Sequence, residues 1–121
     1  MIEWKYLAEN GNTSFQYNLG LMYENGKGVP QNFEIAIKWY TLAAEQGVAR
    51  AQYNLGVLYK SGTGTSRDIP RAHKWLNITA TQGHKGAKKL REKIEKKMTP
   101  AQLENAERLF RECVEKKYKG C

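Results

Sequence analysis

Two asparagines at equivalent positions are the strongest candidates for recognition chemistry in this 121-residue sequence. The stretch QYNLGLMY at residues 16–23 returns as QYNLGVLY at residues 52–59, so that Asn18 recurs as Asn54. Asparagine is a poor helix former, but its amide offers both a donor and an acceptor. Two such amides about 10 Å apart, the spacing of neighbouring helices, can pair with the backbone of an extended peptide. The recurrence therefore favours peptide binding, with common ancestry of two repeats as the alternative explanation.

Catalytic and metal-binding chemistry finds little support in the sequence. An enzyme needs a converging nucleophile, base or metal cluster. His73 and His84 are the two histidines, and neither has a helix-spaced acid and a cysteine or serine partner. The two cysteines lack the partners and the spacing of a zinc site. We therefore expect no catalytic residue, metal or cofactor, and we expect His73 to be a surface or half-buried helix residue.

The net charge of +8 is concentrated in the last third of the sequence. Residues 1–83 carry eight Lys and Arg against six acids, whereas residues 84–121 carry twelve against six. Such a basic surface can bind nucleic acid or anionic lipid. No aromatic residue is interleaved to stack on bases, so a solvated helix face is the competing interpretation, and an acidic protein partner would use the same surface. The basic patch consists of Lys85, Lys88, Lys89, Arg91, Lys93, Lys96 and Lys97.

A repeat of 36 residues must position these side chains. Residues 16–51 align with residues 52–87, and fifteen of the 36 positions are identical. A period of about 20 to 50 residues is typical of a solenoid. Glycine-containing breakers divide each unit into two segments whose apolar residues recur at steps of three and four. Each unit is therefore predicted to be a helical hairpin.

Glycines inside the first helix of each hairpin predict a close helix contact. Gly20 and Gly56 occupy equivalent positions, where glycine costs about 1 kcal/mol relative to alanine. We expect the paired helix to approach closely there, through Ala36 and Ala72 respectively.

The two ends of the sequence are incomplete or modified units. Residues 1–11 end in LAENG, which matches AAEQG of the repeat 16–51 at the same offset, so they form a half repeat. Residues 84–121 form a capping helix pair whose second helix starts at Thr99 with a capping box. The edge helix lacks its natural partner, and we expect it to dock on a second copy or a partner protein, unless the sequence is a truncated piece. The docking residues are Ile2, Trp4, Tyr6 and Leu7.

These motifs resemble the Sel-one-like repeat (SLR) family, which is related to the tetratricopeptide repeat. Family units read like AQYNLGVLY, a GxG loop and AxKWYxxAAEQG, and the match covers nearly the whole chain. The resemblance implies an all-α, right-handed α/α superhelical solenoid of helix-turn-helix repeats, with about seven helices in a single domain over residues 1–121. It also implies a scaffold or adaptor that binds a protein or peptide, with the first helix of each hairpin lining the concave groove.

Helical-wheel positions identify which side chains can face that groove. Asn18 lies roughly opposite the apolar stripe that contains Phe15, and Asn54 is its counterpart one unit later. The predicted partner-binding residues are Tyr17, Asn18, Leu21 and Glu24 in the first unit and Tyr53, Asn54, Val57 and Lys60 in the second.

The resemblance also leaves two alternatives open. Some cysteine-rich SLR proteins are linked to penicillin binding and hydrolysis, so a lactam enzyme is the alternative function. The spacing of Cys113 and Cys121 resembles that of the disulfides that join neighbouring helices in such proteins, the alternative being a buried thiol and a frayed tail. The N-terminus lacks the features of a signal peptide, which favours the cytoplasm for the sequence as written. A bridge would favour a periplasmic or secreted protein that has lost its signal peptide. No stretch approaches the roughly 18 apolar residues that a membrane span needs.

Overall fold

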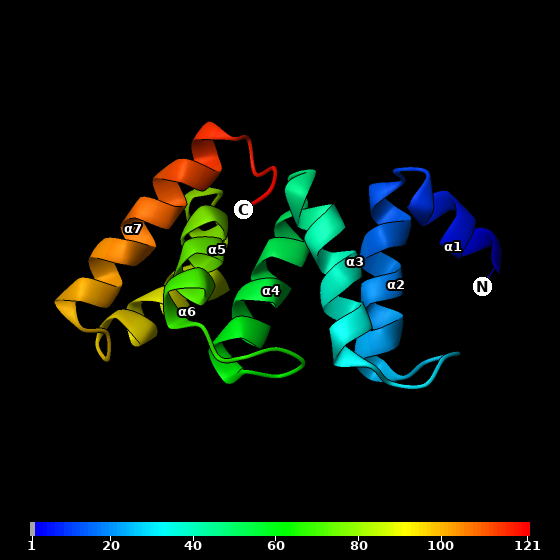
Figure 1. Ribbon diagram of the computed structural model, residues 1–121, viewed down its shortest axis with the longest axis horizontal. Helices are drawn as coiled ribbons and strands as arrows, with labels where there is room; N and C mark the ends of the chain where they lie inside the picture. The colour runs from blue at the N-terminus through cyan, green and yellow to red at the C-terminus, as the bar shows by residue number, and fades with distance from the viewer. Residues whose placement is uncertain (1) are drawn as a thin grey trace.

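The chain folds into a row of α-helices in which each helix from α1 to α5 packs against the next one, while α7 packs against α5 (Figure 1). The computed structural model describes the backbone of residues 2–121 and the side chains of residues 5–121. This part contains seven helices and no strand, and it forms the all-α superhelical solenoid that the resemblance implied. The helices are α1 (Ile2–Glu9), α2 (Thr13–Asn25), α3 (Phe33–Glu45), α4 (Ala49–Ser61), α5 (Ile69–Thr81), α6 (Lys85–Glu95) and α7 (Pro100–Glu115).

The two hairpins, α2–α3 and α4–α5, have the same helix lengths, and their bounds differ by the 36-residue period. Local chemistry explains where the second helices begin. The side chain of Asn32 accepts a hydrogen bond from the backbone N–H of Ile35 at 3.0 Å, and Asp68 does the same for Arg71 at 3.0 Å. Both side chains satisfy an amide of the first turn that has no partner within the helix.

Gly20 and Gly56 lie where the helices of each hairpin come closest. A Cβ at Gly20 would lie 2.4 Å from the ring of Tyr40, and one at Gly56 would lie 2.7 Å from the side chain of Leu76. Tyr40 and Leu76 occupy the same repeat position. The close approach is as expected, and the backbone oxygen of Ala72 lies 3.4 Å from the Cβ position at Gly56. The nearest atoms, however, belong to Tyr40 and Leu76, one turn beyond the small residues that the sequence suggested.

A buried glutamine joins each hairpin to the unit before it. The side-chain amide of Gln16 donates to the backbone oxygen of Ala8 at 3.0 Å, and Gln52 donates to Ala44 at 3.0 Å. Both glutamines are buried, and both bonds connect the first helix of a hairpin with the end of the preceding helix. The repeated glutamine is therefore explained by contacts between units.

The Gln52→Met variant is expected to lose about 1 kcal/mol of unfolding free energy, because methionine keeps the volume but removes the hydrogen bond between units. Urea unfolding measures the change. Gln46→Met is the control, because Gln46 lies on the exposed surface. Equal unfolding midpoints for the parent and Gln52→Met would show that the bond between units contributes nothing.

Helix α5 is the most enclosed helix of the hairpins because α4, α6 and α7 all pack against it. Seven of its thirteen residues are buried, including His73, Lys74 and Trp75. The expectation that His73 is a surface or half-buried residue is wrong, since its side chain is 2% exposed. The reason is tertiary, because α6 and α7 both pack against α5, and Oε1 of Glu95 in α6 lies 2.8 Å from Nε2 of His73.

The segment after α7 also folds back onto the hairpins. A disulfide joins Cys113 of α7 to Cys121, with the Cα atoms 5.4 Å apart. The backbone N–H of Gly120 donates to a carboxylate oxygen of Glu45 at 2.7 Å. The ammonium of Lys74 donates to the backbone oxygen of Cys121. We call residues 116–121 the bridged segment.

None of the helices between residues 2 and 121 combines the length and the apolar character that crossing a lipid bilayer requires.

Candidate functional site

The first helices of the two hairpins enclose a cleft of about 450 Å³, which we call the α2–α4 cleft. It lies at the N-terminal ends of both helices. Two residues predicted to bind a partner, Tyr17 and Asn18, line it. The remaining lining residues are Thr13, Ser14, Val48, Ala49 and Arg50.

The walls of the α2–α4 cleft combine one aromatic ring with an amide that remains available. The ring of Tyr17 packs against that of Tyr40, with centroids 5.9 Å apart and a tilt of 39°. The side-chain amide of Asn18 is half-buried and has no hydrogen bond to any other side chain or backbone group between residues 5 and 121. Its donor and acceptor are therefore free for a ligand in the cleft.

The corresponding space one repeat later is occupied by a side chain. His84 holds the repeat position of Val48, and its ring stacks on Tyr53 with centroids 4.5 Å apart and an interplanar angle of 21°. Nδ1 of His84 also accepts from the backbone N–H of Ala87 at 2.9 Å and caps α6. Val48 caps α4 without a side-chain hydrogen bond. The α2–α4 cleft is thus open because a valine stands where the next unit has an imidazole.

The two repeated asparagines also differ in their bonding. The hydroxyl of Tyr40 donates to a carboxylate oxygen of Glu24 at 3.0 Å, and the side chain of Asn54 lies near this hydroxyl. Burial, with the nearby negative charge of Glu24, raises the pKa of Tyr40 above its usual range, so the hydroxyl keeps its proton. Glu24 therefore serves an internal hydrogen bond and Asn54 lies beside it, whereas Asn18 lines the α2–α4 cleft.

The other predicted groove residues lie apart from the α2–α4 cleft. Leu21 packs against the main hydrophobic core, and Val57 is half-buried. Lys60 lies at the far end of α4, in a second depression. The structure therefore brings together Tyr17 and Asn18 and adds Val48 and Arg50, which sequence reasoning missed. The signal that would have found these two is the unlike pair of residues at positions 48 and 84 of otherwise similar repeats.

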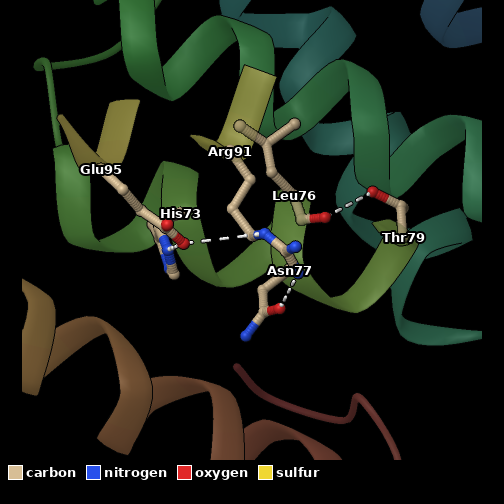
Figure 2. A network of polar contacts seen from close by, with 6 residues as sticks. All are labelled: His73, Leu76, Asn77, Thr79, Arg91 and Glu95. Carbon is tan, nitrogen blue, oxygen red and sulfur yellow. Dashed lines mark hydrogen bonds and ion pairs between the residues drawn. The ribbon is translucent and has the colours of Figure 1, made fainter. Parts of the chain in front are cut away.

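Most of the basic patch is exposed, but one member is a structural residue. Arg91 is half-buried on α6, and its Nη1 donates to the side-chain oxygen of Asn77 on α5 at 2.8 Å. Its Nε lies 3.6 Å from Oε1 of Glu95, the oxygen that also accepts from Nε2 of His73 at 2.8 Å. Figure 2 shows how these four side chains connect the two helices. The exposed members are Lys85, Lys88, Lys89, Lys93, Lys96 and Lys97.

The predicted docking edge on α1 is described only in part. The side chains of Ile2 and Trp4 lie outside the described residues. Tyr6 is 64% exposed and Leu7 is half-buried. Docking of a second copy on this edge stays a prediction. Among the described residues, no group of three or more His, Cys, Asp or Glu side chains is arranged to hold a metal ion.

Comparisons with known proteins agree with the hairpin geometry. The chain is similar to a protective antigen, present in uropathogenic Escherichia coli strains, whose crystal structure displays an SLR fold. The two share 35% identity with a TM-score of 0.89, over 95% of this chain and 25% of that one. A Sel1 repeat protein from Oxalobacter formigenes shares 44% identity with a TM-score of 0.65, over 68% of this chain and 34% of that one. None of the curated proteins matches.

The chain therefore spans about a quarter and about a third of the lengths of these two solved proteins. Sel1 repeats generally serve as scaffolds for protein interactions. The Sel1 repeat family model matches residues 13–48 and 49–84, which are the two helical hairpins with the loops that follow them. Because these matches cover more than half of the chain, it belongs to the Sel1 repeat family.

Proposed function

We propose that this chain is an interaction module that holds an extended peptide segment of a partner protein in the α2–α4 cleft. One observation carries the proposal: the cleft is open, and the amide of Asn18 lines it without a hydrogen-bond partner between residues 5 and 121. A volume of about 450 Å³ lies within the range of sites that hold small ligands or a few residues.

Each wall of the cleft suits a different part of a peptide. The Asn18 amide can donate to a peptide carbonyl and accept from a peptide N–H, whatever the peptide sequence. The ring of Tyr17 offers an apolar face for one peptide side chain. Arg50 is exposed beside the cleft and attracts a carboxylate. The proposed ligand is therefore an extended segment with one apolar and one acidic side chain.

The Val48→His variant tests the proposal with little risk to the fold. It copies the residue at His84 but not its neighbour, because Arg50 stands where the next unit has Gly86, whose missing Cβ would lie 3.1 Å from the His84 ring. The new ring is therefore expected to shift slightly from the His84 geometry while it stacks on Tyr17 and fills the cleft. Peptides are selected on the parent from a displayed random library, and their affinities are measured by fluorescence anisotropy. We expect Val48→His to weaken the selected peptides about tenfold or more, equal to about 1.4 kcal/mol, while thermal unfolding shows no loss of stability.

Two further variants separate the cleft from the rest of the groove. Asn18→Ala removes the free amide and is expected to weaken the same peptides by several-fold, about the value of one or two hydrogen bonds. Asn25→Ala changes an exposed asparagine at the end of the same helix and is expected to leave affinity unchanged. Selected peptides that bind Val48→His as tightly as the parent would rule out the α2–α4 cleft as their site.

A further inference from the structure

A second depression lies at the opposite end of α4 and has a different chemistry. Its volume is about 690 Å³, and it is formed where the ends of α4 and α6 meet the starts of α5 and α7. Ten residues of α4 separate Arg50 from Lys60, which is about 15 Å along a helix. This depression is therefore distinct from the α2–α4 cleft. We call it the basic pocket.

Four cations from three different segments converge on the basic pocket. Lys60 comes from α4, Arg67 from the loop before α5, and Lys93 and Lys97 from α6 and the turn after it. The sequence predicted Lys60 in the groove and Lys93 and Lys97 in the basic patch, and it assigned Arg67 to neither surface. The fold brings them together because α4 and α6 end on the same side of α5.

The positive charge of the basic pocket is not neutralised from within. No carboxylate between residues 5 and 121 lies within ion-pair distance of any of the four cations. Asp68 also lines the pocket, but its carboxylate caps α5 and lies 3.7 Å from Nε of Arg71. A ligand with negative charge would therefore supply counter-charges that the described chain does not provide.

The pocket also has an apolar part, which narrows the class of ligand. Ile69, Pro70 and Ile94 line it together with the cations. No aromatic residue between residues 5 and 121 lines it, so within that part of the chain a nucleic-acid base finds no ring to stack on. A second copy of this chain is disfavoured as occupant, because each copy carries a net charge of +8. Carboxylates on either side of an aliphatic side chain match both parts of the pocket.

We propose that the basic pocket binds an acidic peptide segment of a partner protein, in which carboxylates flank one aliphatic side chain. The carboxylates pair with the lysines and with Arg67, and the aliphatic side chain contacts Ile69 and Ile94. This site is independent of the α2–α4 cleft. A partner that uses both sites would be held at the two ends of α4.

Fluorescence anisotropy with a labelled Glu-Glu-Leu-Glu-Glu peptide tests the proposal on the full chain. The double variant Lys93→Gln/Lys97→Gln removes two cations of the pocket and is expected to weaken this probe about tenfold. The control is Lys88→Gln/Lys96→Gln, which removes the same charge from exposed positions of the same stretch that do not line the pocket. The control is expected to change affinity less than about twofold, because exposed charges at longer range are screened by salt.

The probe sequence separates the pocket from simple charge attraction. Replacing its leucine with serine is expected to weaken binding severalfold if the aliphatic contact exists. Equal losses for the two double variants would overturn the proposal in favour of diffuse attraction. Tighter binding of a short oligothymidylate than of the peptide, with loss in Lys93→Gln/Lys97→Gln, would assign the pocket to nucleic acid and also overturn it. The Val48→His variant is expected to bind the probe with the same affinity as the parent. A failed proposal for the basic pocket can therefore be told apart from a failed proposal for the α2–α4 cleft.

Discussion

Replacing Lys74 with methionine is expected to raise the free energy of unfolding at pH 7 by about 1 to 3 kcal/mol, because it removes a buried charge that no Asp or Glu side chain between residues 5 and 121 pairs with. The side chain of Lys74 is 1% exposed. Its ammonium contacts the backbone oxygen of Cys121 and the face of Trp75, with Nζ 4.5 Å from the ring centroid. No Asp or Glu side chain between residues 5 and 121 lies at ion-pair distance from it. One hydrogen bond and one ring contact stabilise the ammonium less than the hydration that it loses on burial.

The same burial gives the effect a defined pH dependence. Burial, with the positive charge of Arg71, lowers the pKa of Lys74 from 10.5 to about 8. Below pH 8 the lysine is charged in both the folded and the unfolded chain, and the penalty is fully present. Between pH 8 and 10.5 the unfolded chain binds the extra proton, so the stability of the parent rises with pH. The advantage of Lys74→Met should therefore shrink over this interval.

Urea unfolding at pH 7 and at about pH 9.5 measures both effects. Lys38→Met is the matched control, because Lys38 occupies the same repeat position but is exposed on α3. We expect it to change the unfolding free energy by less than about 0.5 kcal/mol at either pH. A lower stability of Lys74→Met at pH 7 would show that the contacts with Cys121 and Trp75 outweigh the cost of burying the charge.

The hairpins were predictable because their determinants are local and repeated. The apolar periodicity, the caps at Asn32 and Asp68 and the glycines at 20 and 56 each act within one hairpin. Each helix of the second hairpin begins and ends 36 residues after its counterpart in the first hairpin. Packing between units depends on Gln16 and Gln52, which the repeat preserved.

The candidate sites were less predictable, because they arise where equivalent positions of the two repeats have different environments. Lys38 and Lys74 are identical in sequence, yet α7 and the bridged segment cover only the second. Asn18 and Asn54 are identical too, but Asn54 lies beside the hydroxyl of Tyr40, whereas Asn18 lines the α2–α4 cleft. A repeat pattern predicts what two units share, whereas ligand sites in this molecule depend on how they differ.

The basic pocket shows a further limit of sequence patterns. Lys60 and Lys97 are 37 residues apart and belong to different helical segments, so no local periodicity relates them. They meet because α4 and α6 both pack against α5 and their last residues line the same depression. The charge of the last third was visible in the sequence, but its concentration in one depression with Ile69 and Ile94 required the tertiary structure.

Reduction of the Cys113–Cys121 disulfide is expected to lower the free energy of unfolding by about 2.5 kcal/mol, which is the loop-closure entropy of a bridge with eight residues of sequence separation. The bridge holds the bridged segment against α3 and α5, where Gly120 bonds to Glu45 and Cys121 bonds to Lys74. Urea unfolding with and without a reductant measures the loss. The Cys121→Ser variant is the control and should not respond to the reductant. Disulfides persist in oxidising compartments. The size of the loss therefore indicates how strongly the fold depends on an oxidising compartment that keeps the Cys113–Cys121 disulfide formed.

The disulfide and Lys74 should be coupled, because the bridged segment is part of what keeps water from the ammonium. When reduction frees this segment in the parent, Lys74 regains water, and the relief offsets part of the lost stability. The Lys74→Met variant has no buried charge to relieve, so reduction should cost it more, by about 1 kcal/mol, than it costs the parent. A double-mutant cycle with the oxidised and reduced forms of both proteins measures this difference. Equal losses would show that the bridged segment does not control the hydration of Lys74, and that α5 and α7 alone bury it.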